Sequence, residues 1–164
     1  MTGLSLRKWG FCMAVLSLSG FAGPAQAAGV AEISNLSDVA FGSIIDFASD
    51  LSISQTVCAY SSTLPSRYSV TGTGSGAGNA FTLTNGTGAL PYEVQWNAAA
   101  GQTSGTKLTA GSALANVASS GLLPGCTLGL TLSGTLTVVL RSADLSSAQS
   151  GMYTGTLTIL LSPS

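Results

Sequence analysis

Residues 153–161 have the sequence YTGTLTILL, in which apolar residues alternate with threonine. Tyr153, Leu157, Ile159 and Leu161 would lie on one face of an extended strand, and the threonines would lie on the other. This period of two is typical of a strand with one buried face and one wet face. Threonine also favours strands. The stretch therefore predicts an antiparallel sheet.

The same alternation recurs along the chain. It is found at residues 67–71, 81–84, 92–96, 128–132 and 136–140. Glycine-rich and polar turn-formers separate these runs, and Asn85-Gly86 predicts a hairpin. No segment has a sustained helical period, although residues 143–148 are expected to form one helical turn. About seven such strands predict an all-β fold, an immunoglobulin-like β-sandwich with little or no helix. A closed barrel is the alternative.

The composition excludes several function classes. The chain has 164 residues, 7% of them charged, with a formal net charge of −1 and no histidine. A chain with this net charge lacks the basic surface that binds nucleic acids, so no nucleic-acid partner is expected. The absence of histidine excludes Ser-His-Asp and Cys-His catalysis and any metal site that contains histidine. The length is that of one domain.

The first 27 residues have the pattern of an export signal. Arg7 and Lys8 precede an apolar stretch at residues 11–21, and small residues precede a cut between Ala27 and Ala28. A membrane anchor is the alternative, but a bilayer span needs about 20 consecutive apolar residues. We therefore predict a signal peptide at 1–27 and export of the remainder, which keeps three basic residues and six acids.

Export places the two remaining cysteines, Cys58 and Cys126, in an oxidising compartment. An even number of cysteines there predicts a disulfide. The bridge would close a loop of about 70 residues, which the chain-entropy model credits with about 4 kcal/mol. Two buried free thiols are the alternative.

Several stretches, in this order along the chain, resemble the spore coat protein U domain family, which includes subunits of archaic chaperone–usher (Csu-type) pili. They are residues 39–42 (VAFG), 57–61 (VCAYS), 68–72 (YSVTG), 81–83 (FTL), 90–96 (LPYEVQW) and 151–159 (GMYTGTLTI). The resemblance covers the chain from about Val39 to its C-terminus.

The resemblance implies a sandwich that lacks its last strand. A periplasmic chaperone fills the gap first, and the N-terminal extension of a neighbouring pilus subunit then replaces it at the outer-membrane usher. Such strand addition uses main-chain hydrogen bonds and pockets for alternate side chains. By resemblance and by their apolar faces, the accepting groove or edge is expected at one of two strands. The candidate residues are Leu136, Val138, Leu140, Tyr153, Leu157, Ile159 and Leu161.

The candidate donor strand is the N-terminal extension at residues 28–37, ahead of the sandwich domain at 38–164. Its apolar residues are Val30, Ala31, Ile33 and Leu36, which do not all share one face. The expected function is that of a structural subunit of a cell-surface fimbrium, serving adhesion or biofilm formation. Two alternatives remain: a pilus tip subunit that donates no strand, and a secreted binding domain that does not polymerise.

No catalytic, metal or cofactor site is predicted, and the protein is expected not to be an enzyme. Asp38, Asp46 and Asp50 lie close in sequence but match no calcium loop. Glu93 and Asp144 could form a glycosidase pair only if the fold brought them together. Trp96 shares a face with apolar neighbours and is expected in the core. The Thr-x-Thr runs, including Thr135 and Thr137, are expected to keep the outer face wet.

Overall fold

The computed structural model of the chain describes residues 29–121 and 132–164. Nearly all of its regular structure is β-strand. The strands are β1 (Ala31–Ser34), β2 (Leu51–Ser61), β3 (Arg67–Gly74), β4 (Thr82–Thr84), β5 (Ala89–Pro91), β6 (Glu93–Asn97), β7 (Thr106–Lys107), β8 (Ala113–Ala118), β9 (Gly134–Leu140) and β10 (Leu157–Pro163). The described helices are η1 (Ala77–Asn79) and α1 (Ser142–Leu145), and neither can span a membrane.

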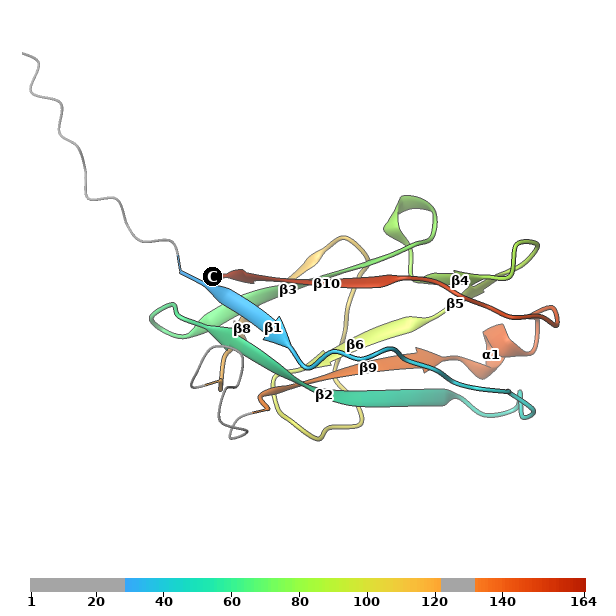
Figure 1. The fold of residues 1–164 in the computed structure, drawn as a ribbon, viewed down its shortest axis with the longest axis horizontal. Helices are drawn as coiled ribbons and strands as arrows, with labels where there is room; N and C mark the ends of the chain where they lie inside the picture. The colour runs from blue at the N-terminus through green and yellow to red at the C-terminus, as the bar shows by residue number, and fades with distance from the viewer. Residues whose placement is uncertain (1–28, 122–131) are drawn as a thin grey trace, which may run out of the picture.

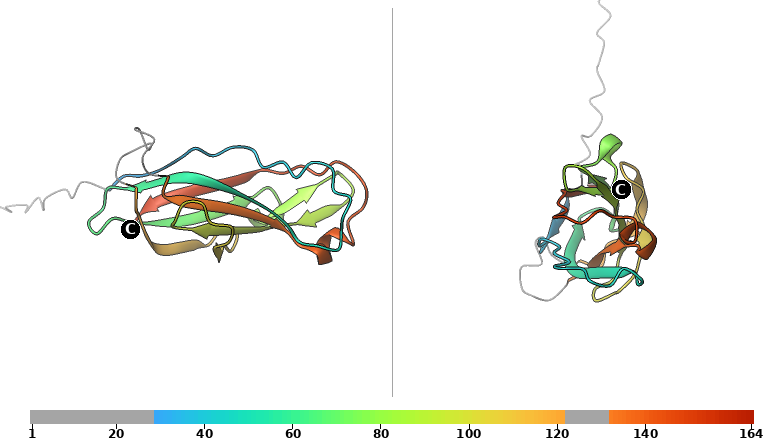
Figure 2. Two further views of the ribbon diagram at one scale, coloured as in Figure 1. Left: turned by 90° about the horizontal axis from the view of Figure 1, so that it is seen from below. Right: turned by 90° about the vertical axis from the view of Figure 1, so that its right-hand side faces the viewer.

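The strands form two antiparallel sheets that face each other (Figures 1 and 2). The larger sheet has the order β1-β2-β9-β6-β7, the smaller one has the order β10-β3-β8, and β4-β5 is a separate hairpin. An antiparallel sheet with one apolar face must bury it against another layer, which is what this arrangement does. The predicted all-β sandwich is confirmed. The strands that the structure describes divide into separate sheets, so the barrel alternative is wrong.

Aromatic side chains join the two sheets through the core. Tyr68 on β3 and Trp96 on β6 are 0% and 1% exposed. Their rings meet edge to face, with centroids 6.2 Å apart and planes at 88°, and Trp96 Nε1 donates a hydrogen bond of 3.2 Å to Tyr68 Oη. Phe81 and Tyr92 form a second pair, with centroids 5.6 Å apart. The predicted core position of Trp96 is confirmed.

The threonines of β9 are buried, contrary to the expectation that they keep the outer face wet. Thr135 and Thr137 are both 1% exposed. Thr135 Oγ1 donates to the carbonyl of Ala99 at 2.7 Å and accepts from the amide of Gln102 at 3.1 Å. The hydroxyls of Thr137 and Ser54 lie 2.8 Å apart. These bonds satisfy groups that burial would otherwise leave unpaired.

Two local predictions are confirmed. The hairpin at Asn85-Gly86 joins β4 to β5, and Asn85 Oδ1 accepts hydrogen bonds from the amides of Thr87 and Gly88. Residues 142–145 form the short helix α1. The predicted signal peptide with its cut between Ala27 and Ala28, and most of the predicted strand at 128–132, lie outside the described residues.

Candidate functional site: the groove between β1 and β10

Strand β10 is an edge strand. It pairs with β3 along its whole length, from Leu157 opposite Gly74 to Pro163 opposite Tyr68. Its other side faces β1, which is likewise the outer strand of its own sheet. Within residues 29–121 and 132–164, no backbone hydrogen bond joins β1 to β10. Two strand edges with free backbone groups therefore lie side by side.

The segment that follows β1, residues 35–50, runs along the same opening before the chain enters β2 (Figure 1). It is held by side chains: Asn35 Nδ2 donates to the carbonyl of Thr56 at 2.9 Å, and Gln55 Oε1 accepts from the amide and hydroxyl of Ser37. In the described chain, residues 35–50 make no backbone–backbone hydrogen bond. Apart from the amides of Ser37 and Ala48, which donate to the side chains of Gln55 and Asp46, their amides and carbonyls are therefore available to a further strand.

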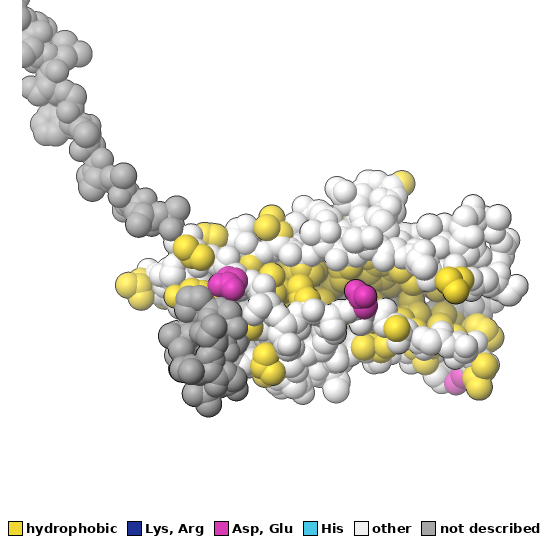
Figure 3. Space-filling view, in the orientation of Figure 1, with side chains coloured by type: hydrophobic (Ala, Val, Ile, Leu, Met, Phe, Trp, Pro, Cys, Tyr) yellow, Lys and Arg dark blue, Asp and Glu magenta, His cyan; other side chains and the backbone are white. Residues whose placement is uncertain are grey.

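Apolar side chains line this opening from both sides. Partly buried residues that pack against the core are found in β1, in residues 35–50 and in β10: Ala31, Ile33, Val39, Phe41, Ile44, Leu157 and Ile159. Figure 3 shows the result as a long furrow of hydrophobic surface between the two layers. We call this furrow, bounded by β10 on one side and by β1 with residues 35–50 on the other, the β1–β10 groove.

The sequence offered two strands as the accepting edge, and the structure separates them. Leu136, Val138 and Leu140 belong to β9, which pairs with β2 on one side and β6 on the other. The expectation that they form an edge is wrong, because both backbone edges of β9 are occupied and the three side chains are buried in the core.

The second candidate strand does form an edge. Leu157, Ile159 and Leu161 lie on β10, with the first two partly exposed and Leu161 buried. Tyr153 lies four residues ahead of the strand, and its buried hydroxyl has no hydrogen-bond partner in the part of the chain that the structure describes.

The candidate donor residues belong to this chain's own sheet. Ala31 and Ile33 lie in β1, which pairs with β2 from Ala31 opposite Ser61 to Ser34 opposite Cys58. Val30 and Leu36 flank the strand and are 57% and 44% exposed. The donor role remains a prediction, because residues 31–34 would have to leave β2 before they could pair with another subunit.

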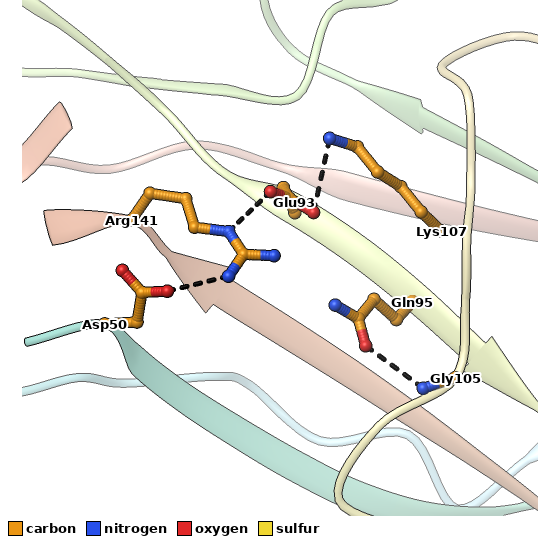
Figure 4. A network of polar contacts seen from close by, with 6 residues as sticks. All are labelled: Asp50, Glu93, Gln95, Gly105, Lys107 and Arg141. Atoms are coloured by element: carbon orange, nitrogen blue, oxygen red, sulfur yellow. Dashed lines mark hydrogen bonds and ion pairs between the residues drawn. The ribbon is translucent and has the colours of Figure 1, made fainter. Parts of the chain in front are cut away.

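A cluster of charges lies on the larger sheet, where the 35–50 segment ends at Asp50 (Figure 4). Arg141, just after β9, donates through Nη1 to Asp50 Oδ2 at 2.7 Å and through Nε to Glu93 Oε1 at 2.5 Å. Lys107 Nζ lies 3.2 Å from Glu93 Oε2, and the amide of Ser142 donates to Asp50 Oδ1 at 2.8 Å. Because Asp50 ends the 35–50 segment, these contacts tie that segment to the larger sheet.

The electrostatics of this cluster follow from its contacts. The hydrogen bond from the Ser142 amide is the main cause that holds the pKa of Asp50 below its usual range, and the hydrogen bond from the Arg141 guanidinium is the second. The hydrogen bond from Arg141 lowers the pKa of Glu93 despite its partial burial, and the two carboxylates raise the pKa of Arg141. A glycosidase acid needs a raised pKa, the opposite direction. Among the described residues, no group of three or more His, Cys, Asp or Glu side chains could hold a metal ion.

Cys58 is 1% exposed and disulfide-bonded. Its predicted partner, Cys126, lies outside the described residues. The pairing of these two cysteines therefore remains a prediction.

The opposite side of the sandwich has a different character. There, β7 and β8 are the outer strands of their sheets, and β7 has only two residues. A hollow of about 440 Å³ lies beside them, and its lining mixes the polar Asn97, Ser104, Thr106 and Asn116 with the apolar Trp96, Leu114 and Val117. A donor strand with alternating apolar residues fits the apolar β1–β10 groove better than this hollow.

Comparisons with known proteins give one likeness of structure. No family model and no curated protein matches the chain. A solved structure from work on a chaperone–tip adhesin complex of CFA/I fimbriae is similar, with 22% sequence identity and a TM-score of 0.47. The likeness covers 70% of this chain and 34% of that one, so this chain spans about a third of the similar protein.

Proposed function

We propose that this protein is an exported structural subunit of a chaperone–usher fimbrium and that its β1–β10 groove accepts a strand from another polypeptide. The observation that carries the proposal is the pair of unpaired edges, β1 and β10, on either side of an apolar furrow. An added strand would gain main-chain hydrogen bonds and would place alternate side chains on the core. Left open, such an edge promotes aggregation.

The proposal implies a sequence of partners. A periplasmic chaperone would fill the groove after export and would yield to a neighbouring subunit at the usher. The fibre would then stand on the cell surface and serve adhesion or biofilm formation. The resemblance to the spore coat protein U family, together with the predicted signal peptide, supports this order of events.

A tip position is the alternative within this proposal. A tip subunit accepts a strand but donates none. The pairing of β1 with β2 favours this position, because residues 31–34 cannot pair with β2 and fill a neighbour's groove at the same time. A shaft position requires β1 to leave its own sheet during assembly.

A fused donor strand tests the proposal. A short glycine-rich loop after Ser164 would carry a strand with valine and isoleucine at alternate positions back along β10. The matched control fusion replaces these apolar residues with serine. Burying four large apolar side chains stabilises by several kcal/mol, so the apolar fusion should melt at least about 10 °C above the control.

The same two fusions are compared by size-exclusion chromatography. The apolar fusion should be monomeric, and the serine control should aggregate or bind a chaperone. Equal melting temperatures and equal monomer content in the two fusions would mean that the groove accepts no strand.

A secreted binding domain is the second candidate, favoured by the hollow beside β7 and β8. Its amide and hydroxyl groups are of the kind that hydrogen-bond sugars. Binding of the serine-control fusion to a glycan array, abolished by Thr106→Ala in the same fusion, would support this function. If the serine-control fusion bound no glycan, the result would count against it.

A further inference from the structure

Most of the chain's acidic residues belong to one side of the β1–β10 groove. Four of the six acids lie between residues 32 and 50, and no lysine or arginine occurs between residues 9 and 66. These acids, Glu32, Asp38, Asp46 and Asp50, belong to β1 and the 35–50 segment. Figure 3 shows acidic side chains beside the furrow and no lysine or arginine on that face.

Three of these acids have no cationic partner. The ion pairs of the described residues use Asp50 and Glu93 as their carboxylates. Arg67, the remaining cation of that part of the chain, donates to the carbonyl of Asn116 on β8. Glu32, Asp38 and Asp46 are therefore unneutralised within the described residues.

The two sides of the groove place these charges next to the outward face of an added strand, which is the face that points away from the core. Ile33 in β1 and Val39 beyond it pack on the core, so Glu32 and Asp38, which immediately precede them, point to the other face of the extended chain. Across the groove, the exposed residues of β10 include Thr158 and Leu160 and carry no charge. An added strand would meet negative charge from one neighbour and uncharged surface from the other.

We propose that the strand which fills this groove is basic on its outward face and comes from a protein of different sequence, not from another copy of this chain. This inference rests on the proposed function. Opposite charges on facing strands stabilise, and like charges directly opposite each other destabilise. A lysine or arginine can also lay its aliphatic stem over the exposed Leu160 and place its charge near Glu32. This chain's own candidate donor, residues 28–37, carries one acid and no lysine or arginine.

Two labelled peptides test the inference. Both carry valine and isoleucine at alternate positions, with lysine between them in one peptide and glutamate in the other. The full chain is refolded from guanidinium chloride with each peptide, and binding is followed by fluorescence anisotropy. At low salt the lysine peptide should bind about 10-fold more tightly, as two or three exposed pairs allow. The preference should shrink in 1 M NaCl because salt screens exposed charges.

Matched variants show where the preference arises. Glu32→Gln combined with Asp38→Asn should reduce the preference to about 2-fold. Asp144→Asn removes a charge from α1, which packs near β5 rather than β1, and should leave the preference near 10-fold. Tight binding of both peptides with equal affinity would overturn this inference and leave the proposed function standing. Failure of both peptides to bind would overturn the proposed function as well.

Discussion

Replacing Tyr68 with phenylalanine should destabilise the sandwich by a defined amount. The Tyr68 hydroxyl accepts the hydrogen bond from Trp96 Nε1, and both side chains are almost fully buried. No other hydrogen bond of the Trp96 indole is found in the described part of the chain. The substitution keeps the edge-to-face ring contact and removes only the acceptor, so the indole N–H is left without a partner in the core.

The expected cost is that of a buried donor left unpaired, about 1–3 kcal/mol. For a chain of this size, 1 kcal/mol corresponds to a change of about 2–5 °C in melting temperature. Tyr68→Phe should therefore lower the melting temperature by about 2–15 °C. In urea, the midpoint should fall while the slope m stays constant, because the surface exposed on unfolding is unchanged.

Tyr92→Phe is the matched control, since the buried Tyr92 hydroxyl has no hydrogen-bond partner in the described residues. Removing it eliminates a desolvated polar group, so stability should be unchanged or slightly higher. Both variants are compared with the unmodified exported chain by urea unfolding monitored through tryptophan fluorescence. Equal losses in the two variants would refute the reasoning, because they would show that the Tyr68–Trp96 bond contributes nothing specific.

Three further predictions concern the charge cluster, Thr135 and Cys58. The pKa values of Asp50 and Glu93 are lowered in the folded state, so their contribution to stability is full above about pH 4.3 and is lost as pH falls through the folded-state values. Glu93→Gln should therefore weaken the fall in the free energy of unfolding between pH 6 and pH 2, measured by urea unfolding at each pH. Thr135→Val should cost about 1 kcal/mol, the worth of its bonds to the covering loop, and should speed proteolysis at residues 98–105; an unchanged cleavage rate would contradict this. Peptide mapping without reduction should recover Cys58 linked to Cys126, and recovery of Cys58 with a free thiol would exclude the bridge.

The strands could be predicted from sequence because one wet face and one buried face produce a period of two. Tyr68 and Trp96 follow this rule, and both lie in the core. The rule fails at β9, where all seven residues are buried. A loop packs on Thr135, whose hydroxyl bonds the carbonyl of Ala99 and the amide of Gln102, and no local sequence pattern predicts that packing.

The accepting edge could only be narrowed to two strands. The apolar residues of β9 and β10 alternate in similar ways, but β9 has partners on both sides and β10 has one. Pairing depends on topology, which local sequence does not encode. The charge cluster was missed for the same reason, because Asp50, Glu93 and Arg141 are far apart in the chain and meet only through strand order.

Hydrogen–deuterium exchange tests the central claim most directly. Exchange is measured on the full chain with and without the lysine-bearing peptide, and peptides covering 31–34 and 157–163 are compared with those covering 106–107, 113–118 and 134–140. If the groove accepts a strand, backbone amides of β1 and β10 should gain protection while β7, β8 and β9 stay unchanged. Protection that appears at β7 and β8, or at none of these strands despite bound peptide, would contradict the account.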